Sequence, residues 1–132
     1  KGGSSPVRGV NGYGEQIDDN GLQLLEGPGN DLVSTTNLTA TGAQIILFTT
    51  GRGTPFGGPV PTMKIATNNQ LYHKKSNWMD FNAGKLLESN NLNELAEDLY
   101  KMVIKIASGQ KRTKNEINDF KEMTIFKKGV TL

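Results

Sequence analysis

Residues 43–49 contain the sequence feature that most constrains the fold, a short apolar run that does not alternate with polar residues. Residues 45–48 read Ile-Ile-Leu-Phe, and a loop rich in Gly and Pro follows at 51–61. A strand with one exposed face alternates apolar and polar side chains, whereas a strand buried on both faces is apolar throughout. The run therefore predicts a strand at residues 43–49 that is covered on both faces, as in a parallel sheet.

Other segments have the patterns of regular elements. Residues 63–67 are expected to form a second strand, and residues 92–108 a helix whose apolar positions 95, 99, 102, 103 and 106 share one face. Asn91 and Glu94 resemble a capping box before this helix, and Gly109 ends it. A short helix at 32–39, capped by Asn30 or Asp31, and a last strand at 123–126 are also expected. This order favours an α/β fold with a mostly parallel sheet and flanking helices.

The first 30 residues hold eight of the 16 glycines, so little regular structure is expected there beyond a short strand at residues 22–25. We therefore predict two parts, a glycine-rich arm at residues 1–30 and an α/β domain at residues 31–132. The chain begins with Lys1 and has no initiator Met. We interpret this start as a cut within a longer polypeptide, against whose remaining part the arm could pack.

The charge balance and the residue types exclude several classes of function. The net charge of +2 comes from 15 basic and 13 acidic residues, which is too balanced to indicate nucleic-acid binding. No apolar run approaches the roughly 20 residues that a membrane helix needs. The chain has no cysteine and one histidine, His73, which we expect on the surface, so a thiolate metal site and a hydrolase triad are not expected. A cytoplasmic protein is expected.

The turn that follows the predicted strand is the first candidate site. Glycine lets the backbone approach a ligand, and its N–H groups can face an anion, while arginine adds a planar charged fork suited to a carboxylate or phosphate. Ligands of α/β proteins bind beyond the carboxyl ends of strands. The alternative is a structural loop whose arginine only pairs with a nearby carboxylate. The turn consists of Thr49, Thr50, Gly51, Arg52, Gly53 and Thr54.

Two further candidates lie downstream of the turn. Lys64 is flanked by Met63 and Ile65, so its side chain either extends to the edge of the sheet or reaches the site. Asp80 and Asn82 would point the same way if the segment around them is extended. Their oxygen atoms suit a hard divalent cation. Equally, Asp and Asn are ordinary turn and cap residues before a glycine.

Taken together, these segments resemble the altronate/galactarate dehydratase family, and more closely its altronate branch. The resemblance is carried by Gly-Pro-Gly-Asn-Asp at 27–31, by Thr-Thr-Gly-Arg-Gly at 49–53, by residues 59–68, and by Asp-Phe-Asn-Ala-Gly at 80–84. It extends through almost the whole chain and is densest from residue 27 to residue 84. Some members carry Cys or Ser near Gly57 and Gly58, and a role of that side chain would not transfer to this chain.

The resemblance implies the C-terminal portion of a lyase that removes water from a hexonate or hexarate and leaves a 2-keto-3-deoxy acid. It implies a Rossmann-like variant of the α/β fold as a fragment of a larger domain, and a divalent metal, Fe²⁺ or Mn²⁺, whose ligands could lie partly outside this chain. Arg52 and Lys64 are then catalytic candidates, and Asn68 joins residues 49–54 as a substrate-binding candidate. Asp80 and Asn82 are the metal-binding candidates.

The resemblance also implies partners, and two alternative functions stay open beside it. The expected partners are a sugar-acid substrate, the remainder of the parent polypeptide and a second copy in a homodimer, and the fragment alone is expected to be inactive. The alternative function is a small-anion-binding or regulatory module without catalytic activity, which would use the same Gly-Arg-Gly turn. A structural or dimerising domain is a third reading, and it predicts a large exposed apolar patch.

Overall fold

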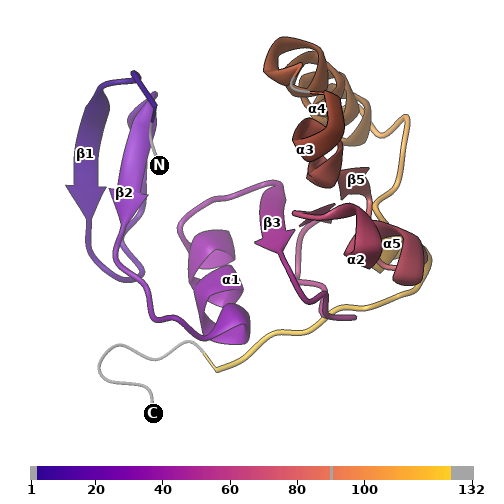
Figure 1. Ribbon diagram of the computed structural model, residues 1–132. Coiled ribbons are helices and arrows are strands. Elements are labelled where there is room, and N and C mark those ends of the chain that lie inside the picture. The colour runs from indigo at the N-terminus through magenta and orange to yellow at the C-terminus, as the bar shows by residue number, and fades with distance from the viewer. Residues whose placement is uncertain (1–2, 90, 126–132) are drawn as a thin grey trace. The chain divides into compact units, whose positions relative to one another are not determined.

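A computed structural model describes residues 3–89 and 91–125, and the chain divides into two compact units. The first comprises Lys1–Gln44 with Met123–Leu132, and the second comprises Ile45–Glu122. The fold is α/β with short parallel sheets, as expected (Figure 1). The units divide the chain at residue 44, not at residue 30, because the first helix groups with the glycine-rich segment.

The glycine-rich segment contains more regular structure than the sequence indicates. β1 (Val7–Asn11) pairs in parallel with β2 (Leu22–Leu25), with Val7 opposite Leu22 and Asn11 opposite Leu25. The strand at 22–25 was expected, whereas β1 was not. Strand pairing uses backbone groups, so a segment with little apolar pattern can still form a strand when a partner lies beside it.

Helix α1 (Asp31–Ala40) confirms the predicted short helix and its cap. Asn30 Oδ1 accepts hydrogen bonds from Leu32 N and Val33 N. The helix is rich in Ser and Thr, which have modest helix propensity, and a buried polar contact helps to hold it. Asn37, 1% exposed, accepts from Gly14 N at 2.8 Å and donates to Glu26 O at 2.9 Å. One amide side chain therefore attaches the preceding glycine-rich segment to α1.

The second unit is built on a parallel sheet in which β4 lies between β3 and β5 within the described residues. β3 (Ile46–Thr50) and β4 (Thr62–Ala66) start and end close to the predicted strands, and β5 is Phe81–Asn82. The expectation that the strand at 43–49 is buried on both faces is wrong. Leu47 on β3 is 48% exposed, and β4 is the strand buried along its whole length. β4 is buried because it lies at the centre of the sheet, a position that the sequence does not show.

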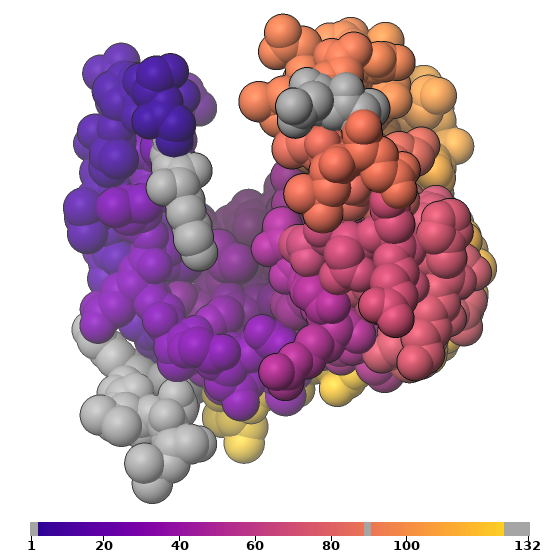
Figure 2. All heavy atoms as spheres, in the orientation of Figure 1, coloured from indigo at the N-terminus to yellow at the C-terminus, as the bar shows by residue number. Residues whose placement is uncertain are grey.

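The helix expected at residues 92–108 is present, and the described part of the second unit contains further helical elements that were not expected. The helical elements of this unit are α2 (Asn69–Lys74), the 3₁₀ turn η1 (Ala83–Lys85), α3 (Leu86–Ser89), α4 (Leu92–Ala107) and α5 (Lys114–Ile117). The Asn91 side chain caps α4 by accepting from Glu94 N. Figure 2 shows α3 and α4 (orange) at the surface of this unit.

Helix α4 covers the core of the second unit with its apolar face. Met63, Ile65, Phe81 and Ile106 form a buried cluster, and the partly buried side chains of α4 that pack against it are Leu95, Leu99, Met102 and Val103. The predicted strand at 123–126 is wrong for residues 123–125, which are in no strand, and Phe126 lies outside the described residues. Over the described part of the chain, no helix has the length and apolar character to cross a membrane.

Candidate functional site

The turn after β3 is an ordered loop held by side chains from the α2 region. Lys75 Nζ donates to Arg52 O at 3.0 Å and to Gly53 O at 3.3 Å, and Asn68 Nδ2 donates to Gly51 O at 3.1 Å. Gly53 has a φ of 78°, a left-handed conformation that glycine adopts without steric cost. The turn therefore has a defined shape at the carboxyl end of β3.

Part of the hydrogen-bonding capacity of the turn is used internally. Gly53 N, one of the amides expected to bind an anion, donates to Thr50 Oγ1 at 2.9 Å. Thr54 Oγ1 accepts from the amide of residue 56. Thr49 and Arg52 are exposed to solvent, so the Arg52 guanidinium is accessible to an anion. The exposed arginine is the part of the predicted anion site that the structure leaves accessible.

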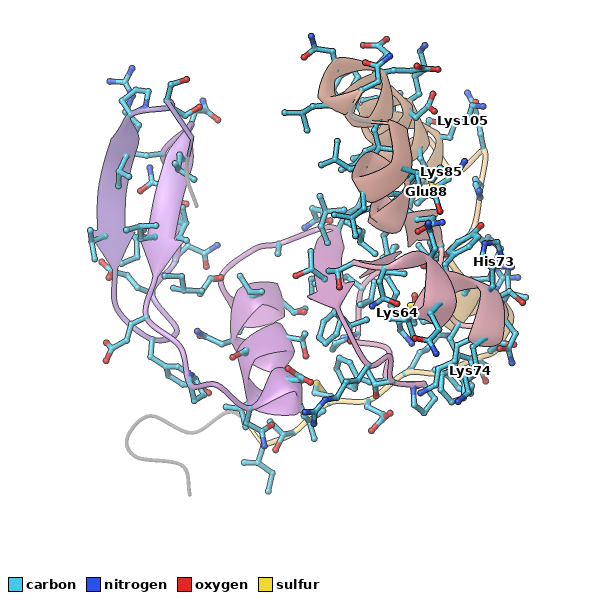
Figure 3. All side chains as sticks on the ribbon, in the orientation of Figure 1. Lys64, His73, Lys74, Lys85, Glu88 and Lys105 are labelled. Carbon is cyan, nitrogen blue, oxygen red and sulfur yellow. The ribbon has the colours of Figure 1, made fainter. Side chains whose placement is uncertain are left out.

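Lys64 lies in the middle of β4, and its side chain is completely buried, with 0% of its surface exposed. Its ammonium group donates to Thr54 O at 2.8 Å and lies 5.7 Å from the centre of the Phe120 ring. The side chain therefore reaches from the central strand to the end of the turn, and Figure 3 labels Lys64 among the side chains of the second unit. Of the two directions that the sequence left open, the side chain takes the one toward the turn and not the one toward the edge of the sheet.

The position of Lys64 changes its acid–base chemistry. Desolvation by burial lowers the pKa of its ammonium to about 8, while the negative charges of Asp80 and Glu122 oppose this shift. A lysine with such a pKa is still mostly charged near neutral pH but loses its proton more readily than an exposed lysine. Lys64 can therefore act as a cation when protonated or as a base after it loses its proton.

Asp80 is buried and both its carboxylate oxygens accept backbone hydrogen bonds. Oδ2 accepts from Lys64 N at 2.8 Å, and Oδ1 accepts from Lys114 N at 2.7 Å. Burial raises the pKa of the Asp80 carboxyl, while these two amides and the charges of Lys111 and Lys114 lower it. The carboxylate thus joins β4 to the start of α5.

Asn82 lies at the end of β5, where its side chain connects two segments. Its Nδ2 donates to Asn69 Oδ1 at 2.8 Å, and its Oδ1 accepts from Gly84 N at 3.0 Å. Asn68, the residue before α2, caps that helix by accepting from Leu71 N. Asn82 therefore connects β5 to the start of α2, and Asn68 connects the start of α2 to the turn after β3 through its hydrogen bond to Gly51 O.

The described residues alone do not fit a divalent metal. Hard cations take six or more oxygen ligands, and protein sites supply several of them as carboxylates. The oxygens of Asp80 and the carbonyl of Asn82 already accept amide hydrogen bonds. Within residues 3–89 and 91–125, no group of three or more His, Asp or Glu side chains could hold a metal ion. Asp80 and Asn82 stay candidates only as part of a larger ligand set.

A cavity of about 330 Å³ lies between β5 and α4. Asp80 and Asn82 line it, together with Lys85, Lys105 and Lys111. Residues 49–54 and Lys64 do not line it, so the structure places the predicted site residues at two locations. The three lysines were not recognised as site residues from the sequence. Lys105 lies on α4 one turn after Lys101, but only the fold shows that this helix face adjoins β5.

The model of the family described as D-galactarate/altronate dehydratase, C-terminal, matches residues 1–131 of this chain. The chain belongs to this dehydratase family. It is 51% identical to the altronate dehydratase of Escherichia coli (strain K12) and 53% identical to that of Bacillus subtilis (strain 168), in both cases over the whole chain. It is 35% identical over 86% of its length to the galactarate dehydratase (L-threo-forming) of Escherichia coli (strain K12).

The chain spans about a quarter of the length of these relatives, 26%, 27% and 22% respectively. This family membership confirms the resemblance carried by the motifs at 49–53 and 80–84. Gly57 has little space around its Cα atom. A Cβ atom at Gly57 would lie 2.2 Å from Phe120 O and 2.6 Å from Asn115 Cβ. A side chain at that position would require the segment at residues 115–120 to move.

Proposed function

We propose that this chain is the C-terminal part of a metal-dependent sugar-acid dehydratase that converts altronate, or a related hexonate or hexarate, to a 2-keto-3-deoxy acid and water. The similarity over the whole chain to two altronate dehydratases, at 51% and 53% identity, is the observation that supports this proposal. The galactarate dehydratase is more distant, at 35%, which favours altronate as the substrate.

The proposed reaction needs a base, an acid and a cationic clamp. A base takes the proton from the carbon next to the carboxylate, and the neighbouring carbon loses its hydroxyl as water after protonation. The resulting enol rearranges to the 2-keto acid. Negative charge develops as an enediolate, which positive groups stabilise. We assign the substrate carboxylate to exposed Arg52, with Thr49, Thr50 and the Gly51 backbone of the same turn beside it.

Lys64 is the proposed base or enediolate partner. Its pKa of about 8 suits proton transfer near neutral pH. Its ammonium is bonded to Thr54 O, the last residue of the turn that carries Arg52. Because Lys64 is buried, a substrate reaches it in this proposal only when the turn moves away from β4. Movement of Thr54 would break the 2.8 Å hydrogen bond and expose the amine.

The metal, Fe²⁺ or Mn²⁺ in this proposal, is bound mainly by residues of the longer polypeptide. When bound, it would stabilise negative charge on the substrate. The cytoplasmic location and the homodimer remain predictions from the sequence.

A chimaera tests the proposal. Residues 1–132 replace the matching segment of the Bacillus subtilis altronate dehydratase, and altronate consumption with formation of the 2-keto-3-deoxy acid is measured with Mn²⁺ or Fe²⁺. We expect the chimaera to dehydrate altronate and the 132-residue chain alone to have no activity. A folded chimaera without any activity would contradict the proposed function and favour a binding module.

Replacing Arg52 with alanine in the chimaera is expected to lower kcat/KM for altronate about 30-fold. A hydrogen bond to a charged group contributes roughly 2 kcal/mol, which corresponds to this ratio. Arg8→Ala is the control, because Arg8 is also exposed but lies on β1. Normal kcat/KM in the Arg52→Ala variant would remove the clamp assignment while leaving the dehydratase proposal intact.

A further inference from the structure

Lys75 connects the segment after α2 to the turn after β3. Its ammonium group donates to two consecutive carbonyls of the turn, Arg52 O at 3.0 Å and Gly53 O at 3.3 Å. A Cβ atom at Gly53 would lie 3.0 Å from Lys75 Cδ, so the carbon chain of the lysine also lies against the turn. Lys75 therefore contacts the turn through both its charge and its aliphatic part.

The Lys75 side chain is itself held in place by Trp78. Its ammonium lies 4.8 Å from the centre of the Trp78 ring, which is a cation–π distance. Trp78 N donates to Lys75 O at 2.9 Å, so the chain bends back after α2 and brings the ring beside the lysine. The ring packs against the buried cluster of Ala66, Leu71 and Met79. Because the core fixes the ring, the ring in turn restricts the directions that the lysine can take.

The two hydrogen bonds from Lys75 orient the peptide groups of the turn. The peptide bonds are trans, and in a trans peptide the C=O of one residue and the N–H of the next point in opposite directions. Since the carbonyls of Arg52 and Gly53 point to Lys75, the N–H groups of Gly53 and Thr54 point away from it. Asn68 Nδ2 binds the carbonyl of the preceding peptide group in the same way. Donors from the α2 region therefore bind three successive carbonyls of the turn.

This orientation determines what an anion at the turn would meet. A carbonyl oxygen carries partial negative charge and repels a carboxylate, whereas an N–H group or a cation attracts it. Without the Lys75 ammonium, the carbonyls of Arg52 and Gly53 would lose their donor and could rotate toward water. The rotating peptide groups include the backbone of Arg52, so its guanidinium would be displaced as well. Lys75 can therefore influence a bound anion through Arg52 without touching the anion.

We propose that Lys75 is a positioning residue of the turn, which fixes the Arg52 and Gly53 carbonyls and thereby holds the Arg52 guanidinium where a substrate carboxylate binds. The carboxylate as ligand rests on the proposed function, whereas the contacts of Lys75 do not. Trp78 supports this role by holding the lysine. Because the effect reaches the substrate through Arg52, loss of Lys75 should weaken binding more than it slows the chemical step.

Lys75→Met in the chimaera tests this role, because methionine keeps most of the carbon chain and removes the charged donor. We expect KM for altronate to rise about tenfold while kcat changes less than about threefold. Lys75→Arg keeps a charged donor that can stack on Trp78, so it should restore KM to within about threefold of the unchanged chimaera. Lys74→Met, at the neighbouring exposed lysine labelled in Figure 3, should leave both constants unchanged.

A double variant shows whether Lys75 acts through Arg52. If it does, adding Lys75→Met to Arg52→Ala should raise KM by less than about twofold, whereas independent effects would multiply. Circular dichroism establishes that each variant is folded. A partial loss of folded enzyme would lower kcat and leave KM unchanged, so the ratio of the two constants separates positioning from mere destabilisation. The proposal is overturned by a normal KM in Lys75→Met, by a Lys75→Arg variant as impaired as Lys75→Met, or by multiplying effects in the double variant.

If the chimaera is inactive, a titration of the isotopically labelled 132-residue chain with altronate decides. Amide NMR shifts at residues 51–54, with a dissociation constant that Lys75→Met raises about tenfold, would support the role of Lys75 although the proposed dehydratase function fails. No shift at these residues, or equal dissociation constants, would overturn it. An active chimaera in which Lys75→Met has a normal KM leaves the proposed function standing and removes the role of Lys75 alone.

Discussion

Replacing Gly84 with alanine is expected to destabilise the second unit by about 4 kcal/mol. A Cβ atom at this position would lie 2.4 Å from Asn69 N, 2.5 Å from the Asn68 carbonyl carbon and 2.6 Å from its Cα. These are backbone atoms, so no side-chain rotation relieves the overlap. Forced overlaps in packed regions cost roughly 1 to 3 kcal/mol and more where the backbone must move.

The substitution would also disturb the polar network at the ends of β4 and β5. Gly84 N donates to Asn82 Oδ1, and Asn82 in turn donates to Asn69. Separating η1 from the start of α2 would break one or both of these hydrogen bonds. Urea unfolding followed by circular dichroism measures the free energy of unfolding, and NMR shifts of Asn69 and Asn82 report the network.

Gly51→Ala is the matched control for Gly84→Ala. A Cβ atom at Gly51 would lie 3.4 Å from Thr67 Oγ1, which is an ordinary van der Waals distance. Gly51 belongs to the same unit and is exposed, so we expect a change below about 1 kcal/mol. An equal loss of stability in both variants would show that the close backbone approach at Gly84 is not the cause.

The second large effect concerns Lys64, whose burial should make the stability of the protein rise with pH. Burial lowers the pKa of the ammonium from 10.5 to about 8 in the folded chain. Below about pH 8 both states carry the proton, and the folded state bears the full cost of a buried charge. Between about pH 8 and 10.5 the folded state releases its proton first, so it binds fewer protons than the unfolded state. Stability therefore increases with pH in this window.

Comparison with Lys64→Met isolates this contribution, because the other titrating groups are common to both proteins. We expect the free energy of unfolding of the unchanged chain to rise by roughly 2 to 3 kcal/mol, relative to Lys64→Met, between about pH 7 and pH 10. Lys74→Met, at an exposed lysine, should show no such pH dependence relative to the unchanged chain. A constant difference between the unchanged chain and Lys64→Met across this range would mean that Lys64 keeps an ordinary pKa.

The helices were predictable because their signals are local. The apolar positions of α4 repeat with the helical period, and Asn91 and Glu94 mark its start within four residues. Asn30 marks the start of α1 in the same way. Capping and amphipathic periodicity depend only on neighbours along the chain, so the structure changed the bounds of these helices by no more than one or two residues.

β1, the order of the strands and the site depended on partners that are distant in the sequence. β1 has no strong apolar pattern and exists because β2 lies beside it. The motifs at 49–53 and 80–84 identified the family. Their spacing did not show that Asn82 lines the cavity between β5 and α4 whereas Arg52 does not. Lys85, Lys105 and Lys111 line this cavity, and no local sequence pattern indicates that they lie close together.

The sequence by itself determined the family, the α/β class, the main helices with their caps and the short list of candidate side chains. Only the tertiary structure decided that β4, and not β3, is the buried central strand, and that Lys64 is a buried lysine bonded to the turn after β3. The physical reason is that helix periodicity and capping act between residues close in the chain. Burial, strand order and pKa shifts are set by groups that only folding brings together.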